Sequence, residues 1–397
     1  MRPCPRRRLV AVLVLLCFVG PLSTDMYLPA FPRMAVDLRT DASGVQATLA
    51  AFLAGMTLGH LVFGPVSDRY GRRVPLLVGA GGCAVATGVC AVAPGLDGVV
   101  AGRFLAGFGG AAGVVIGRAV VTDIAEGAVA ARLLGVLMAL AGLAPVLAPL
   151  AGGLVIEAVG WRGVFTVLAG AALLVAGAVL VAVPESLPPD RRHPGGGREL
   201  LRTVREVTGD RAYAGYSLAF TFAFGALFSY IAGAPFVLQR VLGLSVGASS
   251  AVFACGAVCT ALTGAVGARL TARTGPERLL RTGAYAMCAG AASLLAAALA
   301  GALTLPVCLS LTALTCGGLG LVTGNATALA LARVPHAAGT GSALLGTAQS
   351  ALGAAVTPLV GLAGAENGGP VFGAMTACGA ATLLAARWAG RADAAGR

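Results

Sequence analysis

Residues 164–183 read VFTVLAGAALLVAGAVLVAV, a run that contains no charged side chain. At ~1.5 Å per residue, a helix of this length crosses the ~30 Å hydrocarbon core of a bilayer. The run is apolar on every face, whereas a strand of a membrane barrel alternates apolar and polar positions over about ten residues. The stretch therefore predicts a membrane-spanning α-helix.

Similar runs recur along all 397 residues, of which 57% are hydrophobic and 11% charged, with a mean hydropathy of +0.88. This composition lies outside the range of water-soluble globular domains. We therefore expect an all-α membrane protein. Its twelve predicted spans are 8–30, 45–64, 74–94, 99–120, 132–154, 162–183, 213–236, 246–268, 279–300, 303–326, 338–363 and 370–388.

One long polar stretch separates the first six predicted spans from the last six. It covers residues 184–212 and reads PESLPPDRRHPGGGRELLRTVREVTGDRA. Its proline, glycine and charge content predicts a flexible cytoplasmic linker. We therefore expect a helix bundle over 1–183 and a second over 213–397. Duplicated transporter folds have this organisation, with the binding site between the halves near mid-membrane.

The charge distribution predicts the orientation in the membrane. All 28 basic residues are Arg, and with 16 acidic residues the net charge is +12. A nucleic-acid-binding protein can have this balance, but here the arginines lie in short clusters between apolar runs. With the N-terminus inside, the inner segments hold 22 arginines and the outer segments hold four. This asymmetry predicts that both termini are cytoplasmic and argues against a nucleic-acid partner.

The loop after the second predicted span carries the most specific motif. Residues 64–73 read GPVSDRYGRR and match the pattern G-x-x-x-D-R-x-G-R-R. The motif resembles the signature of the major facilitator superfamily, which implies twelve helices in two six-helix pseudo-repeats. Asp68 can then pair with charges on a neighbouring helix and latch one conformation; an ordinary basic loop is the alternative. The residues of this expected latch are Gly64, Asp68, Arg69, Gly71, Arg72 and Arg73.

A weak internal repeat also favours a duplicated fold. Residues 268–277, ARLTARTGPE, align with residues 64–73 at an offset of 204. The alignment pairs Gly71 with Gly275, but the second copy has Ala272 where the first has Asp68.

Three further stretches resemble the Bcr/CflA drug-resistance branch of that superfamily. They are STDMYLPAFP (23–32), GRFLAGFGGAAGVVIGRAVVTD (102–123) and LAPVLAPLAGG (143–153). The last is similar to the antiporter signature of drug exporters, in which prolines interrupt helix hydrogen bonds and glycines allow close helix contact. A buried kinked helix is the alternative. The residues concerned are Gly142, Pro145, Pro149, Gly152 and Gly153.

Two opposite charges are predicted at similar depth inside the apolar runs. Asp25 lies about 17 residues, or ~25 Å, along the first span, and Arg103 lies about five residues, or ~7 Å, below the outer end of the fourth. A carboxyl group beside a buried arginine can take up and release a proton. The alternatives are that Asp25 caps a turn at Met26 and that Arg103 reaches the outer surface. His60, which we expect to be hydrogen-bonded, is the next candidate for coupling.

Other polar and aromatic groups are expected around a substrate cavity. Tyr27 follows Asp25, and Asn325 and Gln349 are candidates from the second half, with helix packing as their alternative role. An aromatic wall with few polar groups suits a broad range of hydrophobic drugs.

Together these features predict a proton-coupled exporter of hydrophobic or cationic drugs that works by alternating access. The alternative within the same fold is an exporter of a sugar or an amino-acid-like metabolite. An enzyme is not expected, because the three histidines are scattered and no metal, nucleophile or cofactor site is visible. A chain without Lys cannot form a G-x-x-x-x-G-K-[ST] loop for ATP. The expected partners are a drug-like substrate, protons and the bilayer, with the chain as a monomer in the inner membrane of a bacterium.

Overall fold

The computed structural model describes residues 7–125, 142–189, 192, 197–362 and 368–395, with the single positions 129, 133 and 137. Every regular element among these residues is helical, as the sequence predicts. The chain divides into two compact units, one of residues 1–40 with 47–196 and the other of residues 41–46 with 197–397. We call them unit 1 and unit 2.

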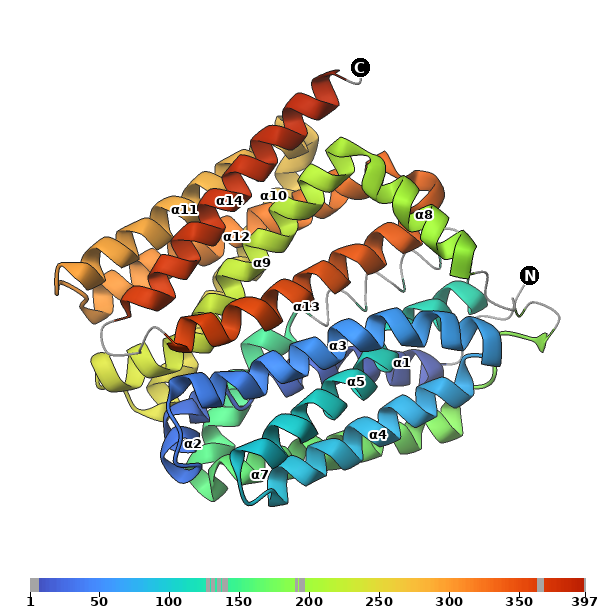
Figure 1. Ribbon diagram of the computed structural model, residues 1–397, viewed down its shortest axis with the longest axis horizontal. Helices are drawn as coiled ribbons and strands as arrows, with labels where there is room; N and C mark the ends of the chain where they lie inside the picture. Colours follow the sequence, from blue (N-terminus) through green and yellow to red (C-terminus); the bar gives the residue numbers. More distant parts are fainter. Residues whose placement is uncertain are drawn as a thin grey trace. The chain divides into compact units, whose positions relative to one another are not determined.

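Unit 1 is a bundle of long helices (Figure 1). Helix α4 packs against α5 and α7, and α1 packs against the same two helices. The elements are α1 (Arg7–Asp25), η1 (Leu28–Ala30), α2 (Phe31–Asp37), α3 (Ala42–Tyr70), α4 (Arg73–Val92), α5 (Leu96–Ile124) and α7 (Ala144–Ala182). The first residues of α3, 42–46, belong to unit 2.

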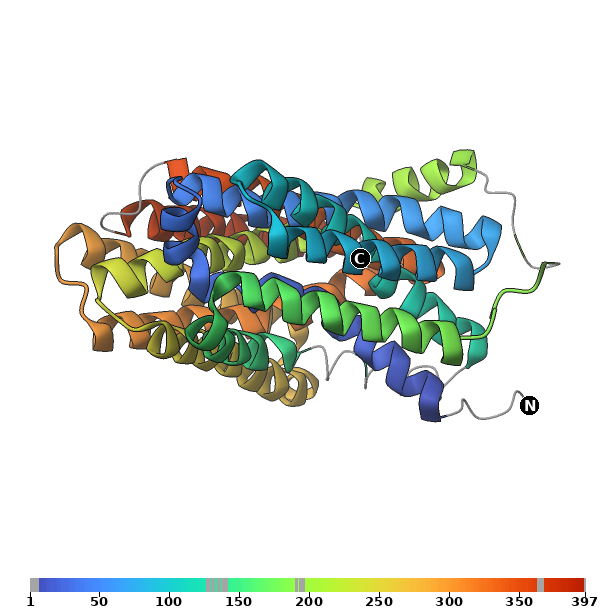
Figure 2. The same ribbon diagram turned by 90° about the horizontal axis from the view of Figure 1, so that it is seen from below.

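Unit 2 is a second bundle, in which α9 packs against α12, α13 and α14 (Figures 1 and 2). Helix α11 packs against α12 and α14, and α10 packs against α12. The elements are α8 (Gly197–Gly209), α9 (Arg211–Phe236), η3 (Val237–Val241), α10 (Val246–Thr274), α11 (Pro276–Leu299), α12 (Leu305–Arg333), η4 (Pro335–Ala337), α13 (Ala338–Leu362) and α14 (Gly369–Ala395).

Eleven helical segments of the described residues are long and apolar enough to span a membrane. One of them, α7, contains two predicted spans, because the chain bends at Gly160. The φ of Gly160 is 77°, in the left-handed region that glycine adopts without the strain a Cβ would cause. The predicted fifth span began at residue 132, and most positions before 142 lie outside the described residues.

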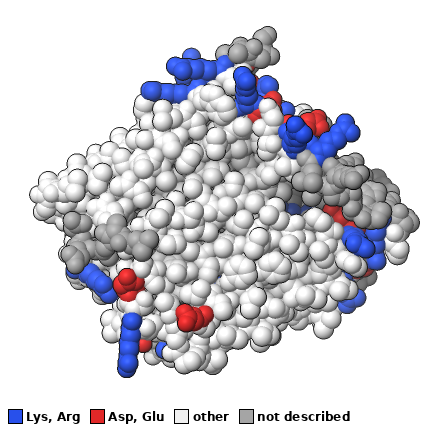
Figure 3. Space-filling model, viewed as in Figure 1, with Lys and Arg blue, Asp and Glu red and all other residues white. Residues whose placement is uncertain are grey.

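The sides of the helices present apolar groups to their surroundings. Val181 is 85% exposed, Val92 is 79% exposed and Leu174 is 78% exposed. Charged side chains on the visible face gather near helix ends, with a broad uncharged surface between them (Figure 3). Such a surface is stable in contact with lipid and would aggregate in water.

The predicted internal repeat is present in the backbone. Gly71 lies between α3 and α4 with a φ of 92°, and Gly275 lies between α10 and α11 with a φ of 80°. Both glycines therefore make a left-handed bend at the corresponding junction of each unit.

The predicted linker is more ordered than its composition suggested. Residues 197–209 form α8, which packs against α9 and α13, and Val207 is fully buried in the core of unit 2. Apolar residues spaced three or four apart in this stretch give a helix one face to bury. Positions 190, 191 and 193–196 lie outside the described residues.

Candidate functional site

Asp25 is the last residue of α1 and is buried, with 7% of its surface exposed. Across the part of the chain that the structure describes, its carboxylate forms no hydrogen bond or ion pair. The alternative that Asp25 caps the next turn is therefore wrong. The N-cap of η1 is Tyr27, and no side chain caps that helix.

Arg103, on α5, is fully buried and surrounded by aromatic rings. Its guanidinium carbon lies 4.1 Å from the ring centre of Phe52, 4.4 Å from that of Tyr27 and 5.8 Å from that of Phe165. We call these three side chains the aromatic cage. Each ring presents the negative face of its π system to the cation, an interaction worth ~2 kcal/mol or more when it is desolvated. The alternative that Arg103 reaches the outer surface is wrong.

The expected pairing of Asp25 with Arg103 is absent among the described atoms. The three guanidinium nitrogens are buried and have no hydrogen-bond partner there. The chain leaves α1 directly after Asp25, and it is the ring of Tyr27, two residues later, that lies over the guanidinium. The cage thus takes the place of the acid that we predicted beside Arg103.

Close packing of α3 against α5 positions the cage. A Cβ atom on Gly107 would overlap the backbone oxygen of Phe52, and one on Gly55 would overlap that of Phe104. The absence of side chains here lets the two backbones approach and brings Phe52 over Arg103. Two contacts fix the position of Tyr27: its hydroxyl lies 3.2 Å from that of Thr48, and its ring packs on Phe165.

The residues of the predicted antiporter motif lie at the start of α7. Gly152 packs directly against α1, where a Cβ atom would overlap the carbonyl oxygen of Met26, the residue after Asp25. Gly153 is also buried, and Pro149 lies inside the helix. Gly142 precedes the helix in a turn, and Pro145 lies in the first turn. The prediction that Pro145 interrupts the helix is therefore wrong, because a first-turn residue needs no backbone N–H partner.

The predicted latch is organised around Arg72, the N-cap residue of α4. Its guanidinium donates to Asp68 and Ser67, and its Nε atom lies 3.1 Å from Asp123 Oδ2 at the end of α5. Among the described residues, Asp68 therefore reaches the neighbouring helix α5 only through Arg72. Burial opposes the charge of Arg72, but the hydrogen bonds to Asp123 and Asp68 outweigh it and raise the pKa of the guanidinium.

The chain after α7 also binds the latch. Glu185 accepts hydrogen bonds from the backbone N–H groups of Arg72 at 2.8 Å and Arg73 at 3.3 Å. Ser186 donates to Asp123 at 2.8 Å, and the Arg73 side chain donates to the Leu180 carbonyl at 2.8 Å. Burial alone would raise the pKa of Glu185, but its backbone donors lower it.

The remaining latch residues have smaller roles in the geometry. Gly71 makes the left-handed bend described above, and its Cα faces the carboxylate of Glu185 so closely that a Cβ atom would overlap it. Arg69 lies over the ring of Tyr70, and a Cβ atom on Gly64 would make only an ordinary contact with Val115, at 4.0 Å. Sequence reasoning missed Asp123, Glu185 and Ser186 as members of this cluster.

The candidates from the second half lie in unit 2. Asn325 is buried, donates to the Leu321 carbonyl at 2.8 Å and accepts from the Thr271 hydroxyl at 3.2 Å. Its amide therefore joins α12 to α10. Gln349 is half-buried on α13. His60, in α3, was expected to be hydrogen-bonded, but its two ring nitrogens are buried without a partner among the described residues.

The sequence of this chain is similar to those of known membrane transporters. The sequence profile of the Major Facilitator Superfamily matches residues 13–358. An uncharacterized MFS-type transporter, YdgK of Bacillus subtilis (strain 168), is 36% identical over 90% of this chain and 89% of its own length. The bicyclomycin resistance protein homolog of Haemophilus influenzae is 29% identical over 95% and 94%.

A solved structure shares the fold. The inward-facing, occupied structure of a bacterial homolog of the human lysosomal transporter Spinster superposes with a TM-score of 0.77, covering 97% of this chain and 96% of that one. The two sequences are 17% identical, so this likeness concerns the fold alone.

Proposed function

Because this chain belongs to the Major Facilitator Superfamily, we propose that it exports hydrophobic or cationic drug-like molecules in exchange for protons. The similarity to a bicyclomycin resistance protein homolog over nearly the whole chain supports a drug-like substrate. Export of a sugar or an amino-acid-like metabolite is the second candidate, since this fold serves many substrates.

The single observation that carries the proposal is the buried, unpartnered carboxyl group of Asp25. A charged carboxylate in such a place is costly, so binding a proton or a cationic substrate there is favourable. If proton and substrate use the same carboxyl group in turn, inward movement of one drives outward movement of the other.

In this proposal, the guanidinium of Arg103 supplies a positive charge to the region where proton and substrate exchange. The guanidinium is held by three rings rather than by an acid, so its positive charge is not cancelled by a carboxylate. Such a charge would favour the proton-free form of an acid that approached it during the transport cycle. Tyr27 connects the two parts, because it lies two residues after Asp25 and is a member of the cage.

The distribution of arginines supports an orientation with both termini in the cytoplasm. In that orientation the cluster around Arg72 lies at the cytoplasmic end of unit 1 and acts as the conformational latch. It ties α3, α4, α5 and the end of α7 together in the state that the structure represents. We propose that the chain works as a monomer.

Drug efflux in a bacterium that lacks its own exporters tests the function. Cells expressing the protein should survive a panel of hydrophobic and cationic antibiotics better than control cells, and a protonophore should abolish the difference. Asp25→Asn should remove resistance at equal membrane abundance. Asp97→Asn, which changes an exposed acid in the first turn of α5, is the matched control and should remain active.

Two results would contradict the proposal. Resistance that survives collapse of the proton gradient would remove the antiport mechanism. Proton-dependent transport of sugars or amino acids, without protection against any antibiotic, would favour the metabolite exporter.

A further inference from the structure

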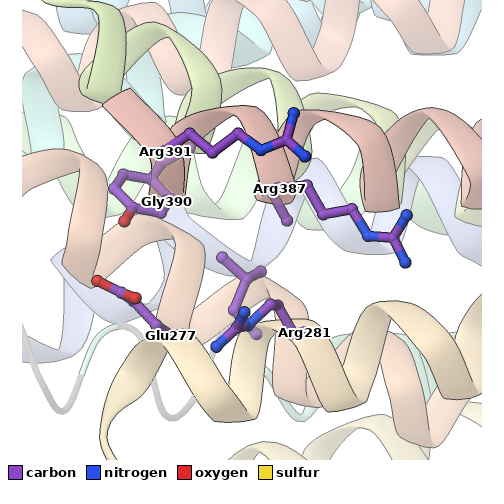
Figure 4. Close-up of a pocket in the computed structure, with 8 residues that line it drawn as sticks. Glu277, Arg281, Arg387, Gly390 and Arg391 are labelled. Carbon is purple, nitrogen blue, oxygen red and sulfur yellow. The ribbon is translucent and has the colours of Figure 1, made fainter. Parts of the chain in front are cut away.

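A cavity of about 390 Å³ lies at one end of unit 2, between α11 and α14 and beside Tyr216 of α9. The distribution of arginines assigns this end to the cytoplasm. Glu277 and Arg281 reach the cavity from α11, and Arg387 and Arg391 reach it from α14 (Figure 4). The volume falls within the ~300–1,000 Å³ range of small-molecule sites.

The charge of the cavity favours an anion, because three arginines outnumber one glutamate. Arg281 and Arg391 form no hydrogen bond or ion pair with any described residue, so their donors are free to bind a ligand. Arg387 is held in place, since its guanidinium donates to the hydroxyl of Tyr285. Guanidinium groups are well suited to phosphate oxygens, which they can bind through two parallel hydrogen bonds.

An apolar strip continues from the cavity into the membrane-spanning part of the same helices. Tyr285, one helical turn from Arg281, is 49% exposed. On α14, Leu384 is 65% exposed and Trp388 is 43% exposed. Tryptophan and tyrosine side chains commonly lie at the boundary between headgroups and hydrocarbon. Tyr285 lies four residues, or ~6 Å, farther from the end of α11 than Arg281, and Leu384 lies three residues, or ~5 Å, farther from the end of α14 than Arg387. Trp388 lies between Arg387 and Arg391 in the sequence, at the depth of the charged groups.

We propose that this cavity binds the phosphate group of an anionic phospholipid from the cytoplasmic leaflet. The three arginines bind the phosphate, the acyl chains lie along the strip formed by Tyr285 and Leu384, and Trp388 lies at the level of the headgroup. Basic pockets between membrane helices at the cytoplasmic side suit such headgroups. A free phosphate would use the arginines but would gain nothing from the strip, which is why the structure favours a lipid.

Lipid binding to the purified full chain in detergent tests this proposal. Native mass spectrometry would measure retention of dioctanoyl phosphatidylglycerol, dioctanoyl phosphatidylcholine and inorganic phosphate. The phosphatidylglycerol should bind most tightly, since it has both the charge and the chains. The double variant Arg281→Gln/Arg391→Gln should weaken its binding about 25-fold, at about fivefold for each arginine near the membrane surface.

The matched control is Arg269→Gln/Arg273→Gln, which removes two exposed arginines of α10 that do not line the cavity. It should bind phosphatidylglycerol as the unchanged protein does. As a second measurement, phosphatidylglycerol should raise the melting temperature of the unchanged protein and the control, but not that of the cavity variant.

Three outcomes would overturn the proposal. Equal loss of binding in the cavity and control variants would show only general attraction to basic surfaces. Equal binding of phosphatidylcholine would show that the charge is not recognised. Inorganic phosphate that displaces the lipid at equal concentration would show that the site takes a free anion.

Discussion

Two substitutions at the latch are expected to separate stability from transport. Asp68 and Asp123 both bind the guanidinium of Arg72, yet they differ in exposure. The side chain of Asp68 is 54% exposed, whereas that of Asp123 is 17% exposed and that of Arg72 is 10% exposed. Asp68→Asn should therefore leave the folded protein nearly as stable as before, and Asp123→Asn should not.

The magnitudes follow from these exposures. A solvent-exposed ion pair contributes about 0–1 kcal/mol to the free energy of unfolding, so Asp68→Asn should cost no more than that. Hydrogen bonds to charged groups in a mostly buried cluster are each worth about 1.5–3 kcal/mol, and Asp123 accepts from both Arg72 and Ser186. Asp123→Asn keeps a hydrogen-bond acceptor but loses its charge, so a cost of about 1.5–3 kcal/mol is expected.

Asp68→Asn should affect transport much more than it affects stability. A group that contributes little to the stability of one state can still decide between two states, and a tenfold change in population needs only ~1.4 kcal/mol. Asp68→Asn is therefore expected to reduce efflux at least about tenfold at equal membrane abundance. The assays are the melting temperature in detergent and the initial rate of proton-driven efflux from cells.

Either of two results would refute this reasoning. If Asp68→Asn lowers the melting temperature as much as Asp123→Asn, exposure does not determine the energetics of the cluster. If Asp68→Asn transports at the normal rate, the loop contributes only to membrane topology.

Three further predictions concern the site and its supports. Asp25→Asn and Arg103→Ala should each remove pH-dependent efflux. The double variant should lose no more activity than either single variant, because both residues act on the same step. Normal pH-dependent transport by Asp25→Asn would assign the coupling role to another group, with His60 as the next candidate. Gly152→Ala should destabilise the protein by about 1–3 kcal/mol, since its Cβ overlaps the Met26 carbonyl, and an unchanged melting temperature would contradict that contact. Because the folded-state pKa of Glu185 is lowered from 4.5, its stabilising effect is present above that pH and is lost as the pH falls through the lower folded value. The melting temperature should thus fall less steeply on acidification for Glu185→Gln than for the unchanged protein, and parallel curves would argue against this assignment.

The sequence predicted the helices well because hydrophobic length is a strong signal in membrane proteins. The superfamily and its drug-resistance branch, inferred from short motifs, are confirmed by the profile match and by relatives named for drug resistance. Two helices were predicted too short at their C-terminal ends: α3 continues to Tyr70 where the predicted span stopped at 64, and α12 continues to Arg333 where it stopped at 326. Hydropathy marks the part of a helix inside the hydrocarbon, and these helices continue beyond it with polar residues.

The partners within the candidate site could not be predicted from the sequence. Arg72 was found from its motif, but Asp123 and Glu185 are 51 and 113 residues away from it and carry no pattern of their own. Arg103 was expected to pair with an acid, because charge is easily read from a sequence. Its actual neighbours are rings from α3, from α7 and from the turn between α1 and η1, which only the fold brings together.

The second half of α7, after the bend at Gly160, touches both the aromatic cage and the latch. Phe165 lies against Arg103 near one end, and the Leu180 carbonyl binds Arg73 near the other. Fifteen residues of helix separate them, a lever arm of about 22 Å. A helix without a loop or a proline in this stretch tilts as a rigid rod, so a rotation of about 5° at the cage would displace the far end by about 2 Å. We propose that tilting of this helix moves the aromatic cage and the Arg73 contact together, through a single piece of secondary structure.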